Sequence, residues 1–310
     1  MGISRRQFTS LALGSAAGLA MSEGRAAESF PGATDCHVHI IGPADKYPMV
    51  PNRPYTPPTA SVAQLKAMHA RLGIARTVLV QPSFYGTDNS CMLDALRELG
   101  NSARGVAVVA PNVPDQTLRD MDAKGVRGIR INLESGGNRD PKAAAALLAA
   151  YAKKVAPLNW HIQIYTVAPV IGQLVQQLAD MNVPVVIDHY GMPDPVQGYG
   201  TKGFSALVDL AHAHKVYVKL SAPYRVSKLP DYNDVKNLAQ TLIYAGRPNM
   251  LWGSDWPHTQ TIPGHPATEV TPFSKIDDEA VLRQFSSWYP DATTRKMILV
   301  DNPAKLYRFT

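Results

Sequence analysis

Two histidines stand two residues apart in a short apolar run near the start of the chain, His37 and His39, and Asp35 comes just before them. Side chains of a β-strand alternate between its two faces, so we expect both imidazoles on one face, with Asp35 behind them. Two neutral imidazoles at the end of a strand can ligate a metal or hold an anionic substrate. The alternative is that both rings pack in the core, where each would need a buried hydrogen-bonding partner.

Asp255 lies between Trp252 and Trp256, and Pro257 follows Trp256. Aromatic walls desolvate a carboxylate and would raise its proton affinity, as a general base acting near neutral pH requires. The residue before a proline is conformationally restricted, which would hold the carboxylate in place. We therefore predict that Asp255 is a general base.

Other polar side chains stand in apolar, strand-like runs. Between residues 127 and 133 the isoleucines and Leu133 share one face, which leaves Arg130 and Asn132 on the other. A guanidinium there suits the carboxylate or sulfonate of a substrate, or a buried ion pair with an acid such as Asp35. His189 ends another apolar run, where it could polarise a carbonyl, bind a metal or cap the backbone.

The elements that must position these residues form one repeating pattern. From residue 33 onward, short runs rich in β-branched residues alternate with helical patterns. The predicted strands are Asp35–Ile40, Arg76–Val80, Gly105–Ala110, Gly128–Leu133, His161–Tyr165, Val185–His189, Val216–Leu220 and Met250–Gly253. The pattern predicts a single α/β domain, a (β/α)8 TIM-type barrel over residues 28–310. A doubly wound open sheet is the competing architecture, but no glycine-rich nucleotide-binding turn follows the first strand.

In such a barrel the site lies at the C-terminal ends of the strands. Polar residues stand at these ends in the sequence: His37, His39, Gln81, Ser83, Arg130, Asn132, Tyr165, His189, Ser221 and Asp255. The proline-rich segment Tyr47–Pro58, which contains Tyr55, follows the first strand and would form a fixed loop that covers the site or only connects elements.

Charge and composition narrow the function classes. The net charge is +6, but the chain has no Lys/Arg run, so we expect small anionic substrates and no nucleic acid. Two cysteines exclude a disulfide framework and a cysteine-rich zinc site. Arg5 and Arg6 precede the apolar run from Leu11 to Met21, which is too short to span a bilayer. Residues 1–27 thus resemble a twin-arginine export signal, and we predict a periplasmic protein with no other membrane contact.

Several motifs together resemble those of the amidohydrolase superfamily, most closely the group of 2-pyrone-4,6-dicarboxylate lactonases and 4-sulfomuconolactone hydrolases. The motifs are Asp35-Cys36-His37-Val38-His39, Val80-Gln81-Pro82-Ser83, Arg127-Gly128-Ile129-Arg130, Asp188-His189-Tyr190-Gly191, Gly253-Ser254-Asp255-Trp256-Pro257-His258 and Asp301-Asn302-Pro303. The resemblance implies a barrel hydrolase that opens a small anionic lactone, with Asp255 activating water. It implies that the histidines hold or polarise the lactone and that acid groups are bound by the remaining site residues: Ser83, Arg130, Tyr165, Arg225 and, from the proline-rich loop, Tyr55.

Two departures from the family pattern bear on metal and substrate. Superfamily members with a tightly bound metal usually add a histidine on the fifth strand, where this chain has Tyr165, and a nearby guanidinium repels a metal. We therefore expect no cofactor. The alternative is a metal-dependent hydrolase or decarboxylase with one zinc or manganese ion on His37, His39, His189 and Asp255. A non-catalytic periplasmic binding protein is a further alternative.

The second departure concerns the acid clamp. The pyrone lactonases carry a further arginine just past the fourth strand and a histidine just past the second, and these places hold Gly136 and Tyr85 here. The clamp for a dicarboxylate is therefore altered, and sulfonated lactones and sugar-acid lactones are candidate substrates as well.

Overall fold

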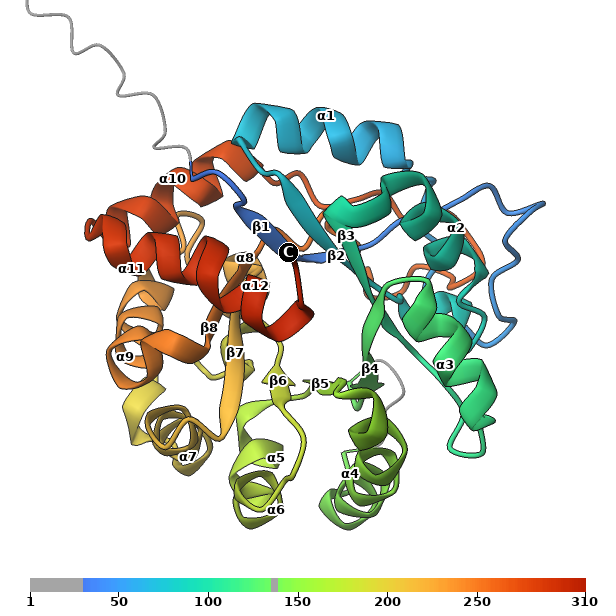
Figure 1. The fold of residues 1–310 in the computed structure, drawn as a ribbon. Coiled ribbons are helices and arrows are strands. Elements are labelled where there is room, and N and C mark those ends of the chain that lie inside the picture. The colour runs from blue at the N-terminus through green and yellow to red at the C-terminus, as the bar shows by residue number, and fades with distance from the viewer. Residues whose placement is uncertain (1–29, 135–138) are drawn as a thin grey trace, which may run out of the picture.

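Eight parallel strands form a nearly closed barrel in residues 30–134 and 139–310, the part of the chain that the computed structural model describes. Each strand pairs with the next along the chain (Figure 1). The strands are β1 (Thr34–Val38), β2 (Arg76–Val80), β3 (Ala103–Ala107), β4 (Val126–Asn132), β5 (His161–Tyr165), β6 (Val185–Ile187), β7 (Val216–Ser221) and β8 (Met250–Gly253). The predicted (β/α)8 barrel is confirmed.

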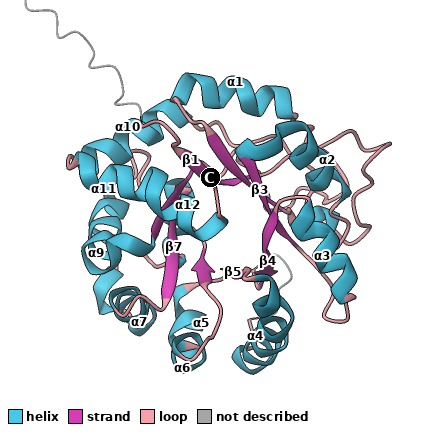
Figure 2. Ribbon diagram, viewed as in Figure 1, coloured by secondary structure: helices cyan, strands magenta, loops and turns pink. Residues whose placement is uncertain are grey.

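Helices surround the barrel as an outer ring, and the last of them lies across one end of it (Figure 2). They are α1 (Val62–Leu72), α2 (Ser90–Leu99), α3 (Asp115–Ala123), α4 (Pro141–Val155), α5 (Ala168–Gln173), α6 (Val175–Ala179), α7 (Lys202–His212), α8 (Pro223–Val226), α9 (Lys236–Gly246), α10 (Asp278–Trp288), α11 (Ala292–Lys296) and α12 (Asn302–Tyr307). Residues at the ends of α1 show why the helix has these bounds: Ser61 and Gln64 form a capping box, and Gly73 ends it at φ 68°. No described helix is long and apolar enough to cross a membrane.

The end of β6 differs from the prediction. The strand was expected to run to His189 but ends at Ile187, because His189 and Tyr190 adopt φ values of 49° and 58°. Positive φ breaks the alternation of a strand, so Asp188 and His189 both point toward the barrel mouth. Between β5 and β6 the chain forms two short helices, α5 and α6, in place of one longer helix.

β1 also departs from simple alternation. It carries one extra residue relative to β2 between Asp35 and Val38, which is a β-bulge. Consequently two neighbouring residues face inward. Cys36 packs with the apolar side chains inside the barrel, and His37 Nδ1 lies 3.5 Å from the Lys219 Nζ. Our expectation that the histidines share a face is met, but Asp35 does not stand behind them on it.

The seam between β1 and β8 has no continuous ladder. Two main-chain hydrogen bonds close it, from Asp255 N to the His37 carbonyl and from His39 N to the Trp256 carbonyl, both 2.9 Å long. These bonds bring the histidine pair beside Asp255, although the residues lie at opposite ends of the barrel sequence.

The buried Asp35 side chain completes this seam. Its carboxylate accepts hydrogen bonds from the Ser254 main chain (2.9 Å) and hydroxyl (2.5 Å), and lies 3.2 Å from Nε2 of His69. The idea that Asp35 pairs with Arg130 is therefore wrong, because its bonding capacity is used on the outer side of β1.

The C-terminal segment fills the other end of the barrel. Leu306, Tyr307 and Phe309 pack with the inward-facing valines of the strands, and Figure 1 shows the C-terminus over the centre of the barrel. The chain thus has a filled floor at the strand N-termini and polar residues at the strand C-termini.

Candidate active site

A cavity of about 100 Å³ lies at the C-terminal ends of the strands. Eight of the predicted site residues line it, as do Pro82, Asn132 and residues 259–261: His39, Tyr55, Ser83, Arg130, Tyr165, His189, Arg225 and Asp255. His37, the other predicted residue, is fully buried and contacts the lining residues from below. The sequence-predicted residues therefore come together at one place.

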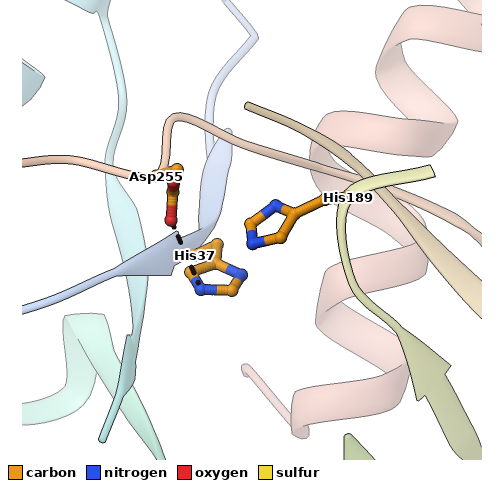
Figure 3. Close-up of side chains that lie close together, drawn as sticks. All are labelled: His37, His189 and Asp255. Atoms are coloured by element: carbon orange, nitrogen blue, oxygen red, sulfur yellow. Dashed lines mark ion pairs between the residues drawn. The ribbon is translucent and has the colours of Figure 1, made fainter. Parts of the chain in front are cut away.

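His37, His189 and Asp255 form the centre of this site (Figure 3). One ligand atom from each lies within 4.8 Å of the others. Asp255 Oδ1 lies 3.6 Å from His37 Nε2 and 3.7 Å from His39 Nε2. Both atoms are buried, and among the described residues neither Asp255 Oδ1 nor His37 Nε2 has a hydrogen-bonding partner, so each keeps an unused hydrogen-bonding or ligand position.

The electrostatics of Asp255 differ from the sequence-based expectation. Its other oxygen, Oδ2, accepts hydrogen bonds from Arg225 Nε and the Tyr224 hydroxyl, both at 2.6 Å. Burial raises the pKa of the Asp255 carboxyl, but the Arg225 guanidinium and the nearby His189 outweigh it and hold that pKa well below its usual range. The prediction of a raised proton affinity is therefore wrong, because tryptophans do not set the environment of Asp255 and Arg225 does.

The histidines are oriented by their second ring nitrogens. His39 Nδ1 lies 2.7 Å from the Val80 carbonyl, which only accepts, so in the neutral ring the proton sits on Nδ1 and Nε2 is a bare acceptor. His189 Nδ1 lies 2.9 Å from the Ser221 hydroxyl, which can donate to it and leave Nε2 as an N–H donor. Burial lowers the pKa of His189 to about 4, so this ring is neutral near pH 7.

The inward position of Arg130 is confirmed, and its acid partner is Asp188. Arg130 Nη2 lies 3.3 Å from Asp188 Oδ2, and its guanidinium carbon lies 5.3 Å from the ring centre of Tyr165. Our sequence reading missed Asp188 because strand alternation assigned it to the outer face. The signal was present, since an acid directly follows the apolar residues of β6.

Lys219 stands in the apolar strand β7 and neutralises a buried acid. Its Nζ is fully buried, donates a 2.7 Å hydrogen bond to Gln163 Oε1 and lies 3.7 Å from Asp188 Oδ1. Burial lowers the pKa of Lys219 to about 8. The role of Gln163, which also donates to Asp188, was not visible in the sequence.

The proline-rich loop forms one wall of the cavity. The Tyr55 hydroxyl donates to Thr259 Oγ1 at 3.0 Å, and the Thr56 carbonyl accepts from Thr271 N at 2.7 Å. The loop is therefore tied to the segment after β8, and Tyr55 lines the cavity, which favours a cover over a plain connection, the two roles that the sequence left open. Tyr85 is buried outside the cavity lining, where its hydroxyl accepts from Gly42 N.

The donor set is chemically suited to one divalent ion. His39 Nε2, His37 Nε2, His189 and Asp255 Oδ1 are the ligand types that zinc uses, and the second-nitrogen contacts of His39 and His189 are the kind that orient metal ligands. Arg225 and Arg130 oppose a cation, but both are already paired with carboxylates. These residues therefore fit a single metal ion.

Comparison with known proteins agrees with the site. Residues 34–309 match the Amidohydrolase family. The chain is 34% identical over 287 residues to a 2-pyrone-4,6-dicarboxylate hydrolase of Comamonas testosteroni, covering 89% of this chain and 90% of that one. It is 33% identical over 281 residues to a 4-sulfomuconolactone hydrolase of Hydrogenophaga intermedia, covering 89% of each.

Solved structures give the same picture. A probable 2-pyrone-4,6-dicarboxylic acid hydrolase of Acinetobacter baumannii, solved with citric acid bound, superimposes with a TM-score of 0.78 at 28% identity and covers 90% of this chain and 100% of that one. The family match spans the whole barrel, and the relatives share its length. The protein therefore belongs to the amidohydrolase family.

Proposed function

We propose that this protein hydrolyses a small anionic lactone. The observation that carries the proposal is the cavity itself, in which a carboxylate with an open oxygen faces three histidines and two arginines stand beside it. The named activities of the two relatives, both hydrolases of anionic lactones, support the same reaction class. Citric acid in the Acinetobacter relative is consistent with a site for small anions.

In this proposal Asp255 and His39 together activate water. Asp255 Oδ1 and the bare His39 Nε2 are both acceptors, so a water molecule between them gives up its proton as its oxygen attacks the lactone carbonyl. Asp255 is ionised at all working pH values, because Arg225 lowers its pKa. Its weaker basicity is offset by its fixed position, which Arg225 and Tyr224 maintain.

The remaining residues bind and polarise the substrate. His189 Nε2–H donates to the carbonyl oxygen as negative charge develops there. The ring C–O bond then breaks, and its oxygen takes up the proton held by the base, which gives a hydroxyl group and a carboxylic acid. The acid releases its own proton to solvent and becomes a carboxylate. Arg130, with Ser83, Tyr165 and Tyr55 around it, binds the acid group of the lactone.

The test is a turnover assay with 2-pyrone-4,6-dicarboxylate, 4-sulfomuconolactone and sugar-acid lactones, with release of acid followed by a pH indicator. We expect Asp255→Asn to lower kcat by roughly 10²- to 10⁴-fold, as the loss of a general base does. Asp120→Asn, on the exposed face of α3, is the matched control and should keep full activity. Turnover by Asp255→Asn within tenfold of the wild type would show that Asp255 is not the base.

The second candidate is a hydrolase or decarboxylase that depends on one divalent metal. The convergence of bare acceptors, His39 Nε2 and Asp255 Oδ1, with the unpartnered His37 Nε2 favours it, and a metal held there would polarise the carbonyl or acidify water. Metal analysis of protein purified without chelator separates the two. Our preferred account expects turnover to survive removal of metal, and near-stoichiometric zinc or manganese that turnover requires would favour the second candidate.

We further propose that the protein is exported to the periplasm by the twin-arginine route. The support is the sequence of residues 1–27, which lie outside the described residues. Fractionation of cells should find the shortened protein in the periplasm, and replacement of Arg5 and Arg6 by lysine should keep it in the cytoplasm at full length. Full-length wild-type protein in the cytoplasm alone would contradict the proposal.

A further inference from the structure

We propose that Asp188 is a positioning residue that holds the substrate-binding Arg130 and the buried His37 in place with a single carboxylate. The inference rests on the proposed lactone hydrolysis and assigns a role to a residue that binds no substrate itself. Asp188 is fully buried and does not line the cavity.

Each oxygen of Asp188 serves a different part of the site. Oδ2 accepts from Arg130 Nη2 at 3.3 Å and from Gln163 Nε2 at 3.0 Å, so it faces the anion-binding side. Oδ1 lies 3.4 Å from His37 Nδ1 and 3.7 Å from Lys219 Nζ, and the other nitrogen of His37, Nε2, lies 3.6 Å from Oδ1 of the base Asp255, so this oxygen faces the water-activating side. The same carboxylate therefore touches both halves of the site.

The backbone makes this double contact possible. Asp188 N donates to the Ile164 carbonyl at 3.0 Å, which continues the pairing of β6 with β5, and the positive φ of His189 follows immediately. The turn places His189 in the cavity and leaves Asp188 beneath it. Asp188 thus lies between Arg130 on β4 and His37 on β1, which share no hydrogen bond that fixes them to each other.

Removal of this carboxylate has separable consequences. Arg130 would lose its only carboxylate partner among the described residues and would no longer be held at the cavity wall. His37 would lose the carboxylate that lies beside its Nδ1, while the Lys219 ammonium group would remain 3.5 Å from that nitrogen. The first change weakens binding of an anionic substrate, and the second slows the chemical step.

The experiment compares Asp188→Asn with the wild type on two matched lactones, 2-pyrone-4,6-dicarboxylate and its uncharged dicarboxamide. We expect KM for the dicarboxylate to rise roughly tenfold, as the loss of one oriented charge-assisted contact does, and KM for the dicarboxamide to change less than twofold. We expect kcat to fall for both lactones by a similar factor. 4-Sulfomuconolactone serves as a second anionic substrate.

A second variant guards against misfolding. Asp188→Asn combined with Lys219→Met removes one buried charge of each sign, so it should restore the folded yield while the difference in KM between the two lactones persists. Asp120→Asn is the control with unchanged kinetics.

The outcomes distinguish a failure of the proposed lactone hydrolysis from a failure of the role proposed for Asp188. If the wild type opens no lactone ring, the proposed function fails. If the wild type is active and either Asp188 variant shows equal losses on charged and uncharged lactones with KM unchanged, Asp188 has only a structural role and the inference is wrong.

Discussion

The buried imidazoles differ in what surrounds them. His37 and His189 lie among charged groups of the site, whereas His161 lies at the start of β5 with its ring 5.2 Å from that of Tyr307. Burial lowers the pKa of His161 to about 3, so the folded protein keeps this ring neutral where an unfolded chain would protonate it. His161 is therefore a structural histidine, and its effect on the free energy of unfolding depends on pH.

This predicts a pH-dependent stability. Between its unfolded pKa near 6.5 and its folded pKa of about 3, His161 binds a proton only in the unfolded state, so stability falls as the pH is lowered through this window. His161→Leu should remove up to about 1.4 kcal/mol per pH unit of that loss. Urea unfolding at pH 7 and pH 5 checks this, with exposed His212→Leu as control. Parallel pH dependence in His161→Leu and wild type would contradict the prediction.

At the scale of elements, the barrel floor depends on a short terminal helix. α12 and the residues after it place Tyr307 and Phe309 among the inward-facing valines of the strands. Tyr307 is fully buried, yet its hydroxyl has no hydrogen-bonding partner among the described residues. Its contribution to stability is therefore expected to come from the ring and not from the hydroxyl.

Two substitutions at Tyr307 separate these contributions. Tyr307→Ala leaves a cavity and should lower the free energy of unfolding by about 3–5 kcal/mol. Tyr307→Phe keeps the ring and removes an unpaired polar group, so stability should be unchanged or slightly higher. Denaturant midpoints of the two variants and the wild type measure both effects. A loss in Tyr307→Phe as large as in Tyr307→Ala would mean that the hydroxyl makes an essential bond.

At the scale of the whole molecule, the closure of the barrel joins its first and last strands. The seam carries few main-chain bonds, and the Asp35 carboxylate supplies further contacts to Ser254, 219 residues away in the chain. Because this closure also places His37 and His39 beside Asp255, the integrity of the seam and the geometry of the site are linked.

Asp35→Asn should therefore weaken both. The amide offers one acceptor where the carboxylate offers two, so a buried donor of Ser254 loses its partner, which should cost about 1–3 kcal/mol of stability. The unfolding temperature and kcat of Asp35→Asn should both be lower than those of the wild type, while exposed Asp45→Asn should change neither. An Asp35→Asn enzyme with wild-type stability would show that main-chain bonds alone close the barrel.

Much of this architecture could be predicted from sequence, because alternating strand and helix patterns fix the barrel and the strand ends fix where polar residues gather. What could not be predicted depends on local breaks in that alternation and on side-chain pairing. The bulge in β1 brings Cys36 inward beside His37, and the positive φ at His189 turns its ring to the same side as Asp188, which shares the inner face with Val186. The pairing of Arg225 with Asp255 inverts the expected proton affinity of the base, and no periodic pattern reports such a contact.

The filled floor has a kinetic consequence. Since Tyr307 and Phe309 occupy one end of the barrel, the lactone enters and the opened product leaves through the same mouth. Ring opening adds a carboxylate, so the product carries one more negative charge past Arg130 and Arg225 than the substrate did. Product should therefore compete with substrate for free enzyme, and its departure, which salt would hasten, becomes a candidate for the slowest step of the cycle.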